Sequence, residues 1–291
     1  MKDETIDKYR QAGLIAAKIL RDGAKEIRIG APYLDIVESI ESRVTEEGAA
    51  LAFPLNLSLN EDAAHDTASS GDTRILAKGD VAKLDLGVHV DGYIADTATT
   101  VDLGTNSLLV EASQQALEAA ISRIRPGVPV GDLGMAVQAE IETRGYRPIS
   151  NLTGHGLDQY VLHRSPTIPN IGIKGGVILE EGMVFAIEPF ASTGSGHVTE
   201  KTRREIYSRI SPKPVRIPAG RAILEQIKDR RGLPFARRWL NEKRMDLALS
   251  TLLRSQVLHV YPVLADIPGS VVSQAEHTII VTSDGCIVTT R

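Results

Sequence analysis

The stretch LDLGVHVDGYIADTATTVDL, residues 84–103, is the most informative part of the sequence. Its two runs, 84–90 and 93–103, are rich in Val, Ile, Thr and Tyr, and Asp91-Gly92 lies between them. A type I′ turn needs positive φ at both central positions, so Asp-Gly between two such runs indicates a β-hairpin. We therefore expect two antiparallel strands joined by a tight turn.

The turn also determines which side chains share a face of the hairpin. Gly87 would lie opposite Asp96 and Asp85 opposite Ala98, which makes Asp85 and Asp96 diagonal neighbours with Cα atoms roughly 7–8 Å apart. A shift of one residue would put the two carboxylates on opposite faces. Two nearby carboxylates repel each other, so one should take up a proton unless a cation binds. The hairpin thus places two candidate ligands within reach of one ion.

Three further residues of metal-ligand type follow in apolar strand patterns or glycine-rich turns. His155 lies between two glycines, which let the backbone approach an ion closely. Glu188 follows the apolar run VFAI, and Glu276 precedes HTIIVT. Together with Asp85 and Asp96 the acids carry four negative charges, which two divalent cations would cancel. Any one of the five could be an ordinary surface acid or a structural histidine, but the whole set predicts a metal centre.

The composition is that of a globular protein in a reducing compartment. Hydrophobic residues make up 42% of the 291 residues and charged residues 24%, enough for a large core. Cys286 is the only cysteine, which excludes a disulfide framework. The sequence has no signal-peptide pattern and no apolar run of about 18 residues. We expect a cytoplasmic monomer that has no membrane contact and, without a glycine-rich phosphate loop, no organic cofactor.

The periodicity predicts an α+β fold with an internal duplication. Two helical segments, 1–30 and 31–48, precede the hairpin, and two more, 107–127 and 130–145, precede a second set of strands. Strands joined mainly by hairpins favour a mostly antiparallel sheet flanked by helices, related by an internal pseudo-two-fold. The stretch 149–170 carries glycine and histidine and shows little periodicity.

Residues 200–257 differ from the rest of the chain in charge. They contain 15 Lys and Arg against 6 Asp and Glu, a net of +9, which leaves −13 for the remainder. We predict an inserted helical subdomain here, with 1–199 and 258–291 forming the main domain. The expected core of this insert consists of Phe235, Trp239, Leu240, Leu247, Leu252 and Leu253.

The ordered set of five candidate ligands resembles the dinuclear metal site of the methionine aminopeptidases and their relatives, whose fold is called the pita-bread fold. The resemblance covers nearly the whole chain. It is carried by the strings FPLNLSLNEDAAH, LDLGVHVDGYIADTA, GHGLDQYVLH, VFAIEPF and SQAEHTIIVT. GLPFARRWL in the insert and the later YPVL resemble the subdomain of type 2 enzymes, and the short N-terminus is similar to archaeal ones.

The resemblance implies a role for each ligand. Asp85 matches a ligand of one metal, His155 and Glu188 match ligands of the second, and Asp96 and Glu276 match residues that bridge both. Glu188 also matches the residue that moves a proton to the leaving amine. The cations would be Mn²⁺, Fe²⁺, Co²⁺ or Zn²⁺, which suit a carboxylate site with one imidazole.

The resemblance also implies residues that contact substrate. His65 and His163 match two histidines of this kind, and His163 would stabilise the oxygen of the scissile carbonyl. Phe53 and Pro54 are candidates for the wall of a methionine pocket. After His65 the family usually has an aromatic residue and then Thr-Pro, whereas this chain has Asp66-Thr67-Ala68. This departure concerns the loop beside the substrate and leaves the metal site untouched.

The function implied is removal of the initiator methionine from nascent chains when the second residue is small. One alternative is a proline-specific peptidase of the same superfamily, although those relatives usually carry a separate N-terminal domain. Another is a non-catalytic RNA- or ribosome-binding relative, although such relatives lose metal ligands. The insert itself could approach the ribosome through its charge, or simply form one wall of the active-site cleft.

Overall fold

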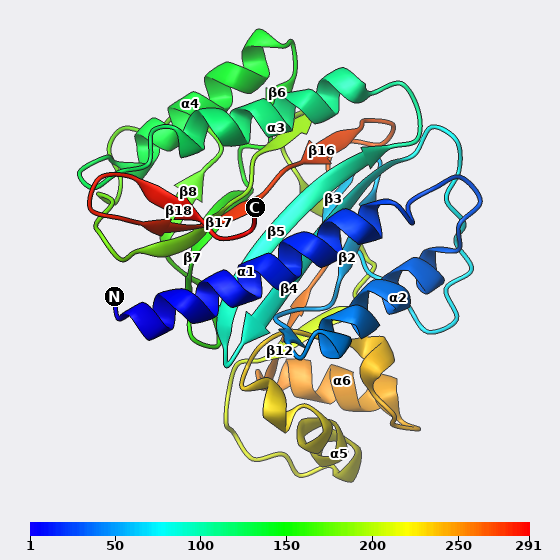
Figure 1. Cartoon of the computed structure of the whole chain (residues 1–291). Coiled ribbons are helices and arrows are strands. Elements are labelled where there is room, and N and C mark those ends of the chain that lie inside the picture. Colours follow the sequence, from blue (N-terminus) through cyan, green and yellow to red (C-terminus); the bar gives the residue numbers. More distant parts are fainter.

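The first half of the fold is a four-stranded sheet covered by two helices. The computed structural model describes residues 1–291. The helices are α1 (Asp3–Ala24) and α2 (Tyr33–Glu46), and the strands are β1 (Ala50–Leu51), β2 (Asn56–Leu59), β3 (Asp62–Ala64), β4 (Val81–Val90) and β5 (Tyr93–Asp102). β4 pairs with β1, β2 and β5, while β3 belongs to another small sheet. Figure 1 shows α1 lying across β4 and β5.

The predicted hairpin is confirmed in position and register. β4 and β5 pair with Gly87 opposite Asp96 and Asp85 opposite Ala98. Asp91 has φ 52° and Gly92 has φ 88°, the positive values that the turn requires. Asp85 and Asp96 therefore share the face that points away from α1 and toward the second half.

The second half repeats the order of two helices followed by strands. It contains α3 (Ser107–Ile121), α4 (Val130–Thr143), β6 (Arg147–Pro148), β7 (Thr153–Asp158), β8 (Val161–Pro169), β9 (Val184–Ile187), β10 (Phe190–Ser192), β16 (Val272–Gln274), β17 (His277–Val281) and β18 (Cys286–Val288). The main sheet has the order β18-β17-β9-β7-β8. The stretch 149–170, which showed little periodicity, proves to hold the β7–β8 hairpin.

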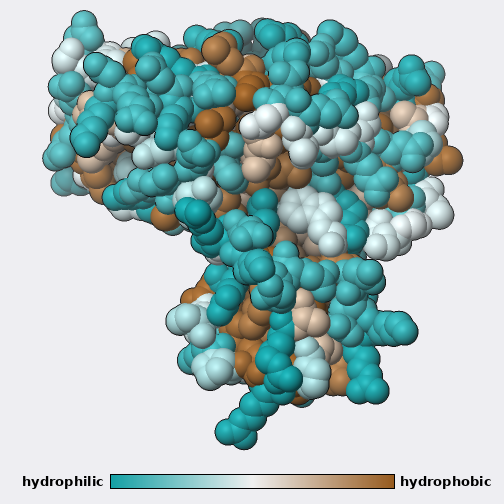
Figure 2. Space-filling model, turned by 60° about the horizontal axis from the view of Figure 1, so that its bottom comes forward, coloured by the Kyte–Doolittle hydropathy of each residue, from teal (hydrophilic) through white to brown (hydrophobic).

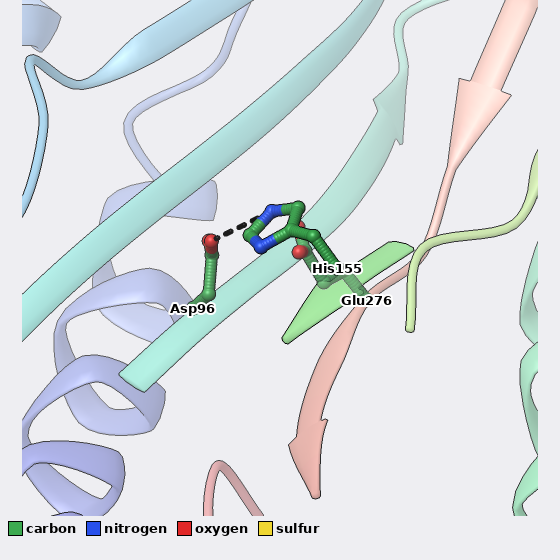
Figure 3. Close-up of side chains that lie close together, drawn as sticks. All are labelled: Asp96, His155 and Glu276. Atoms are coloured by element: carbon green, nitrogen blue, oxygen red, sulfur yellow. Dashed lines mark ion pairs between the residues drawn. The ribbon is translucent and has the colours of Figure 1, made fainter. Parts of the chain in front are cut away.

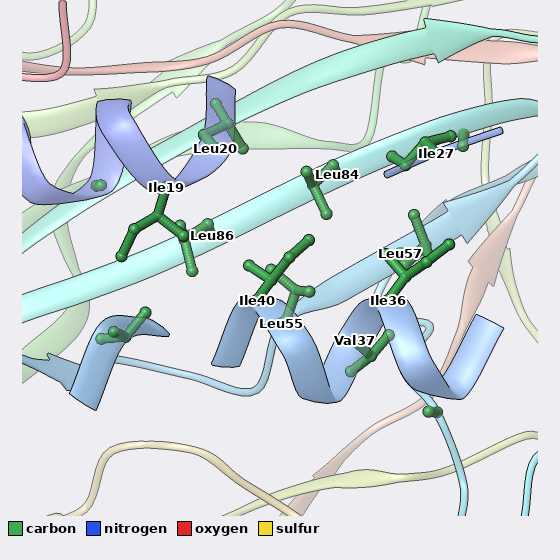
Figure 4. Packing of buried hydrophobic residues seen from close by; sticks show 14 of the residues in the cluster. Ile19, Leu20, Ile27, Ile36, Val37, Ile40, Leu55, Leu57, Leu84 and Leu86 are labelled. Atoms are coloured by element: carbon green, nitrogen blue, oxygen red, sulfur yellow. The ribbon is translucent and has the colours of Figure 1, made fainter. Parts of the chain in front are cut away.

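Each half has its own hydrophobic core, and the α+β prediction is confirmed. The first core lies between α1, α2 and the β4 sheet and includes Ile40, Leu57 and Leu84, none of them exposed (Figure 4). The second lies between α3, α4 and the β9 sheet. All strand pairs within the named sheets are antiparallel.

A backbone seam joins the two halves. Ala98 on β5 and Glu276, just before β17, exchange backbone hydrogen bonds of 3.4 and 3.1 Å. Beside them, the Thr278 hydroxyl accepts a hydrogen bond from the Asp96 amide (2.7 Å) and donates one to its carbonyl (2.9 Å). The seam brings two of the candidate ligands together although 180 residues separate them.

The basic segment forms a small lobe below the main body (Figures 1 and 2). It contains β12 (Ile206–Arg209), α5 (Pro218–Gln226), the 3₁₀ turns η1 (Lys228–Arg230) and η2 (Arg237–Trp239), β13 (Phe235–Ala236) and α6 (Met245–Arg254). The next strand, β14 (Leu258–Tyr261), completes its sheet, whereas β11 (Thr199–Glu200) and β15 (Leu264–Ala265) form a small sheet with β3 of the main body. Hydrophilic side chains project from the face seen in Figure 2.

This lobe differs from the predicted helical insert in two respects. β12 pairs with β13 and β14, so a three-stranded sheet accompanies the helices, and β14 begins beyond residue 257. Phe235, Leu240 and Leu252 are buried in its core as predicted, but Leu247 is 56% exposed because it lies on the outer face of α6. The division at 200–257 remains a prediction. No helix of the structure has the length and apolar character needed to cross a bilayer.

Candidate metal centre

The five candidate ligands converge on one pocket from both halves of the fold. Asp96, His155 and Glu276 each place a ligand-type atom within 4.8 Å of the other two, and Figure 3 shows their side chains turned toward one another. Nε2 of His155 lies 3.7 Å from Asp96 Oδ2 and 3.5 Å from Glu188 Oε1. Asp85 lines the same pocket, and so do the predicted substrate contacts His65 and His163.

Gln274 connects the carboxylates that are not in direct contact. Its Nε2 lies 3.4 Å from Asp85 Oδ2 and 3.3 Å from Glu276 Oε2. The side chain is buried at the end of β16, two residues before Glu276. The sequence reasoning missed Gln274, since a glutamine near an acid is too common a pattern to signal a site.

The electrostatics of these residues suit cations. Burial raises the pKa of Asp85 to about 7. Burial first, and then the charges of neighbouring carboxylates, raise the pKa values of Asp96, Glu188 and Glu276 well above their ordinary range. Burial, followed by the nearby His163, lowers the pKa of His155 to about 3. Without a cation the acids would therefore hold protons and the imidazole would be neutral.

Among the five candidate ligands, two buried carboxylate oxygens have no hydrogen-bond partner within the protein. They are Oδ1 of Asp85 and Oδ1 of Asp96. Ionised carboxylates only accept, so a buried carboxylate oxygen without a donor needs a cation, a proton or a water. Four carboxylates and one neutral imidazole form a donor set that fits first-row divalent cations. The residues present therefore fit a metal centre.

The comparison with known proteins identifies the family. Residues 7–220 match the model of metallopeptidase family M24. The chain belongs to this family. A methionine aminopeptidase of Archaeoglobus fulgidus is 48% identical to it over 292 residues, which cover all of both chains. The resemblance to methionine aminopeptidases seen in the sequence is thus confirmed.

Solved structures support the same conclusion about the fold of this M24 peptidase. A methionine aminopeptidase from Thermotoga maritima superposes with a TM-score of 0.75 at 25% identity, covering 100% of this chain and 98% of that one. A thermophilic Arx1 superposes with a TM-score of 0.90 at 20% identity, covering 99% and 91%. The pita-bread prediction is therefore confirmed.

Two histidines and a tyrosine flank the candidate ligands of this M24 peptidase. The His163 ring lies 4.3 Å from that of His155, and the Tyr261 ring lies 5.6 Å from that of His65. Burial lowers the pKa values of His65 and His163 to about 4, so both are neutral at pH 7. Nδ1 of His65 lies 3.2 Å from the Pro262 carbonyl, which can only accept, so Nδ1 holds the proton and Nε2 is free to accept.

The loop after His65 is held by buried charge. Asp66 has no exposed side-chain surface and accepts hydrogen bonds from Arg74 and from Arg203 Nε, the latter at 2.7 Å. Arg203 also donates to the Thr67 carbonyl and to Asp72. His65 itself has a positive φ of 66°. Asp66, which stands where the family usually has an aromatic residue, thus holds the loop in place through its ion pairs and does not line the pocket.

The apolar part of the pocket comes from the body and the basic lobe together. Phe53 lines it, as predicted, together with Leu162, Ile206 and Pro234. Pro54 was also a candidate but is not in the lining, because it is buried behind Phe53 with its carbonyl accepting from Asn56 Nδ2. Ile206 and Pro234 were missed because nothing local ties residues of the basic segment to this pocket. The whole pocket encloses about 480 Å³.

Proposed function

We propose that this M24 peptidase removes the N-terminal methionine from newly made proteins when the second residue is small, using two divalent cations. The observation that carries the proposal is the convergence of the five candidate ligands beside an apolar wall in one pocket. The full-length similarity to a methionine aminopeptidase supports the substrate. Work on newly made chains implies the cytoplasm, and we infer that a monomer suffices because both halves of the pocket come from one chain.

The cations would be held by the side chains at the bottom of the pocket. Asp85 would bind one, His155 and Glu188 the other, and Asp96 and Glu276 both. When bound, such a pair of cations would supply a nucleophilic water at neutral pH and polarise the peptide carbonyl. Co²⁺, Mn²⁺, Fe²⁺ and Zn²⁺ all suit this donor set.

The protein's own groups would manage protons and orientation. Glu188 lines the pocket beside His155, and we infer from the resemblance that it would take a proton and pass it to the leaving amine. His163 is neutral at pH 7, and its N–H would donate a hydrogen bond to the carbonyl oxygen of the scissile bond. His65, with Nε2 free, would accept a hydrogen bond from the substrate backbone.

The methionine side chain would lie against the apolar wall. Phe53, Leu162, Ile206 and Pro234 offer an aromatic ring and three aliphatic surfaces, which suit a flexible thioether. The metal centre would face the amino group and the peptide bond. This division of the pocket into an apolar and a carboxylate side favours an aminopeptidase over a protein that only binds a partner.

The test measures bound metal and peptide cleavage together. We expect two divalent cations per chain, rapid release of methionine from Met-Gly, Met-Ala and Met-Ser peptides, and almost none from Met-Lys or Met-Phe. Cleavage of X-Pro peptides instead would indicate a proline-specific peptidase. Absence of both metal and cleavage would indicate a binding protein and overturn the proposal.

The arginines of the basic lobe differ in whether they are free to contact a ribosome. The basic lobe carries two arginine pairs, Arg230-Arg231 and Arg237-Arg238. Arg230 and Arg238 are turned into the main body, where Arg230 donates to backbone carbonyls and Arg238 pairs with Glu41. Arg231 stays exposed, and Arg237 pairs with Asp246. Of these four, Arg231 is therefore the one placed to contact a ribosome through this lobe. Co-sedimentation with ribosomes that falls steeply with salt, and weakens in Arg231→Ser, would support it.

A further inference from the structure

Arg230 links the two sides of the apolar pocket. It ends the turn η1 in the basic lobe, and its guanidinium donates only to backbone carbonyls. Nη1 lies 2.6 Å from the carbonyl oxygen of Leu51 and Nη2 lies 3.0 Å from that of Ala52, both in the main body. Nε lies 3.1 Å from the carbonyl oxygen of Pro234 in the lobe.

These carbonyls belong to a wall residue, Pro234, and to the two residues that precede another, Phe53. Ala52 directly precedes Phe53, and Pro234 is itself a lining residue. The Phe53 ring packs against Gly87, where a Cβ would come within 2.2 Å of the ring. Gly87 faces Asp96 across the hairpin. The position of residues 51–53 therefore decides how close the Phe53 ring lies to a candidate ligand.

The charge of Arg230 serves no ion pair. Its guanidinium donates to backbone carbonyls and forms no ion pair. Burial lowers the pKa of Arg230 to about 10, so the side chain is still charged at neutral pH. Five N–H donors in a rigid fork can hold carbonyls of separate segments at a fixed spacing. Lysine, with a single ammonium, could not hold both sides in the same way.

The lobe does not depend on Arg230 alone for its attachment. Arg238 is only 4% exposed and pairs with Glu41 of α2, and it also donates to Thr67 Oγ1 at 2.9 Å. The Trp239 indole donates to the other Glu41 oxygen at 3.0 Å. Loss of Arg230 should therefore leave the lobe docked and change only the local spacing of the wall.

We propose that Arg230 is a positioning residue that fixes the width of the apolar pocket, and thereby the preference for an unbranched side chain at the first substrate position. The inference rests on the proposed function, because it assumes that this pocket receives the first side chain. Arg230 does not line the pocket itself, so it would act through Phe53 and Pro234.

The test compares Arg230→Met, Arg230→Lys and the control Arg237→Met in the full-length enzyme. Arg237 lies in the same lobe and pairs with Asp246 at 2.7 Å, away from the pocket. The substrates are Met-Ala-Ser and Leu-Ala-Ser, which differ by branching at the first side chain. Metal content and melting temperature are measured for each variant.

In Arg230→Met we expect KM for Met-Ala-Ser to rise about tenfold. This is the lower end of the effect that adding or removing one methylene group has on binding in an apolar pocket. kcat should change little, and the Met-to-Leu ratio of kcat/KM should fall by a similar factor, which is the pattern of lost binding rather than lost chemistry. Arg230→Lys should be intermediate and Arg237→Met unchanged, all with full metal content.

An unchanged Met-to-Leu ratio in folded Arg230→Met overturns the inference, and so does an equal loss in Arg237→Met. If Arg230→Met does not fold, Arg230→Lys decides the matter by the same ratio. Failure of the proposed function is distinct, because the wild-type enzyme would then not release methionine at all.

Discussion

Gln274 holds Glu276 and Asp85 with a single amide nitrogen, 3.3 Å from Glu276 Oε2 and 3.4 Å from Asp85 Oδ2. Its amide oxygen is buried and has no partner within the protein. The nitrogen thus spans carboxylates that come from opposite halves of the fold. A donor shared in this way orients both acids before a cation arrives and reduces their mutual repulsion.

Replacement of Gln274 by Met removes the donor while keeping the length of the side chain. We expect the affinity for the added divalent cation to fall about 10- to 100-fold, the usual effect of losing an outer partner of a ligand. Calorimetric titration of the chelator-treated protein with Mn²⁺ measures this directly. Unaltered affinity would show that the amide has no part in arranging the carboxylates.

Asp96→Asn should abolish activity and reduce metal occupancy. The change keeps the shape of the side chain but removes the charge of a carboxylate whose oxygen lies within 4.8 Å of ligand atoms of both His155 and Glu276. Asp102→Asn, at the far end of the same strand, is the matched control, because Asp102 only caps a turn through Gly104 and Asn106. Near wild-type turnover with two metals bound in Asp96→Asn would refute the bridging role.

The hairpin could be predicted to the residue because its signal is local. Asp91-Gly92 fixes the turn, the turn fixes the register, and the register puts Asp85 and Asp96 on one face. The approach of Glu276 to Asp96 is different. It depends on the seam at Ala98, a pairing between segments about 180 residues apart that leaves no pattern in either one.

The missed residues have the same physical explanation. Ile206, Pro234 and Tyr261 line the pocket only because the basic lobe folds back on the body. The three-stranded sheet of that lobe escaped prediction because its strands are two to four residues long, too short for an alternation to stand out. Leu247 was misplaced because its helix has one apolar face, and Leu247 lies off that face.

His163→Ala should leave the metals in place and reduce turnover by about 10²- to 10³-fold, the usual loss for one donor that stabilises a developing oxyanion. His259→Ala provides the control, because His259 lies against Tyr261 but does not line the pocket. Metal analysis of the two variants accompanies the kinetics. Loss of metal from His163→Ala would mean that this histidine is a ligand.

Asp66→Asn tests whether buried charge fixes the loop of His65. Asp66 is fully buried, while Arg74 and Arg203 are about a third exposed, at 31% and 32%. We therefore expect a loss of about 2 kcal/mol in the free energy of unfolding, below the 3–5 kcal/mol typical of a broken buried pair. Urea titration measures it. Asp22→Asn is the control, because Asp22 forms an exposed pair with Lys25 and its replacement should leave the stability almost unchanged.

A raised KM in Asp66→Asn with full metal content would connect this loop to the substrate. The neighbouring His65 has a positive φ that the loop must maintain, so loosening Asp66 should displace its ring. If stability falls while KM stays the same, the network supports the fold but does not position His65.

Removal of the metal should make the stability of the protein fall as the pH rises. The Asp85 pKa is about 7 in the folded protein against 3.8 as the ordinary value, because burial disfavours its charge. A carboxyl group whose pKa is raised on folding binds its proton more tightly in the native state. The contribution of Asp85 to the free energy of unfolding is therefore largest below about pH 4, and it is lost as the pH rises from about 4 to 7. Asp96, Glu188 and Glu276 shift in the same direction and add to the trend.

Divalent cations should cancel this trend, because they replace the protons and stabilise the charged carboxylates. We expect the melting temperature of the chelator-treated protein to fall by about 5 °C or more between pH 5 and pH 8. With saturating Mn²⁺ the melting temperature should stay level or rise over the same range, since proton competition for the ligands weakens. Asp85→Asn should flatten the slope of the metal-free protein, because the neutral amide has no proton to lose. A metal-free melting temperature that rises with pH would mean that these acids are already ionised without cations, and that the pocket is not a metal centre of this kind.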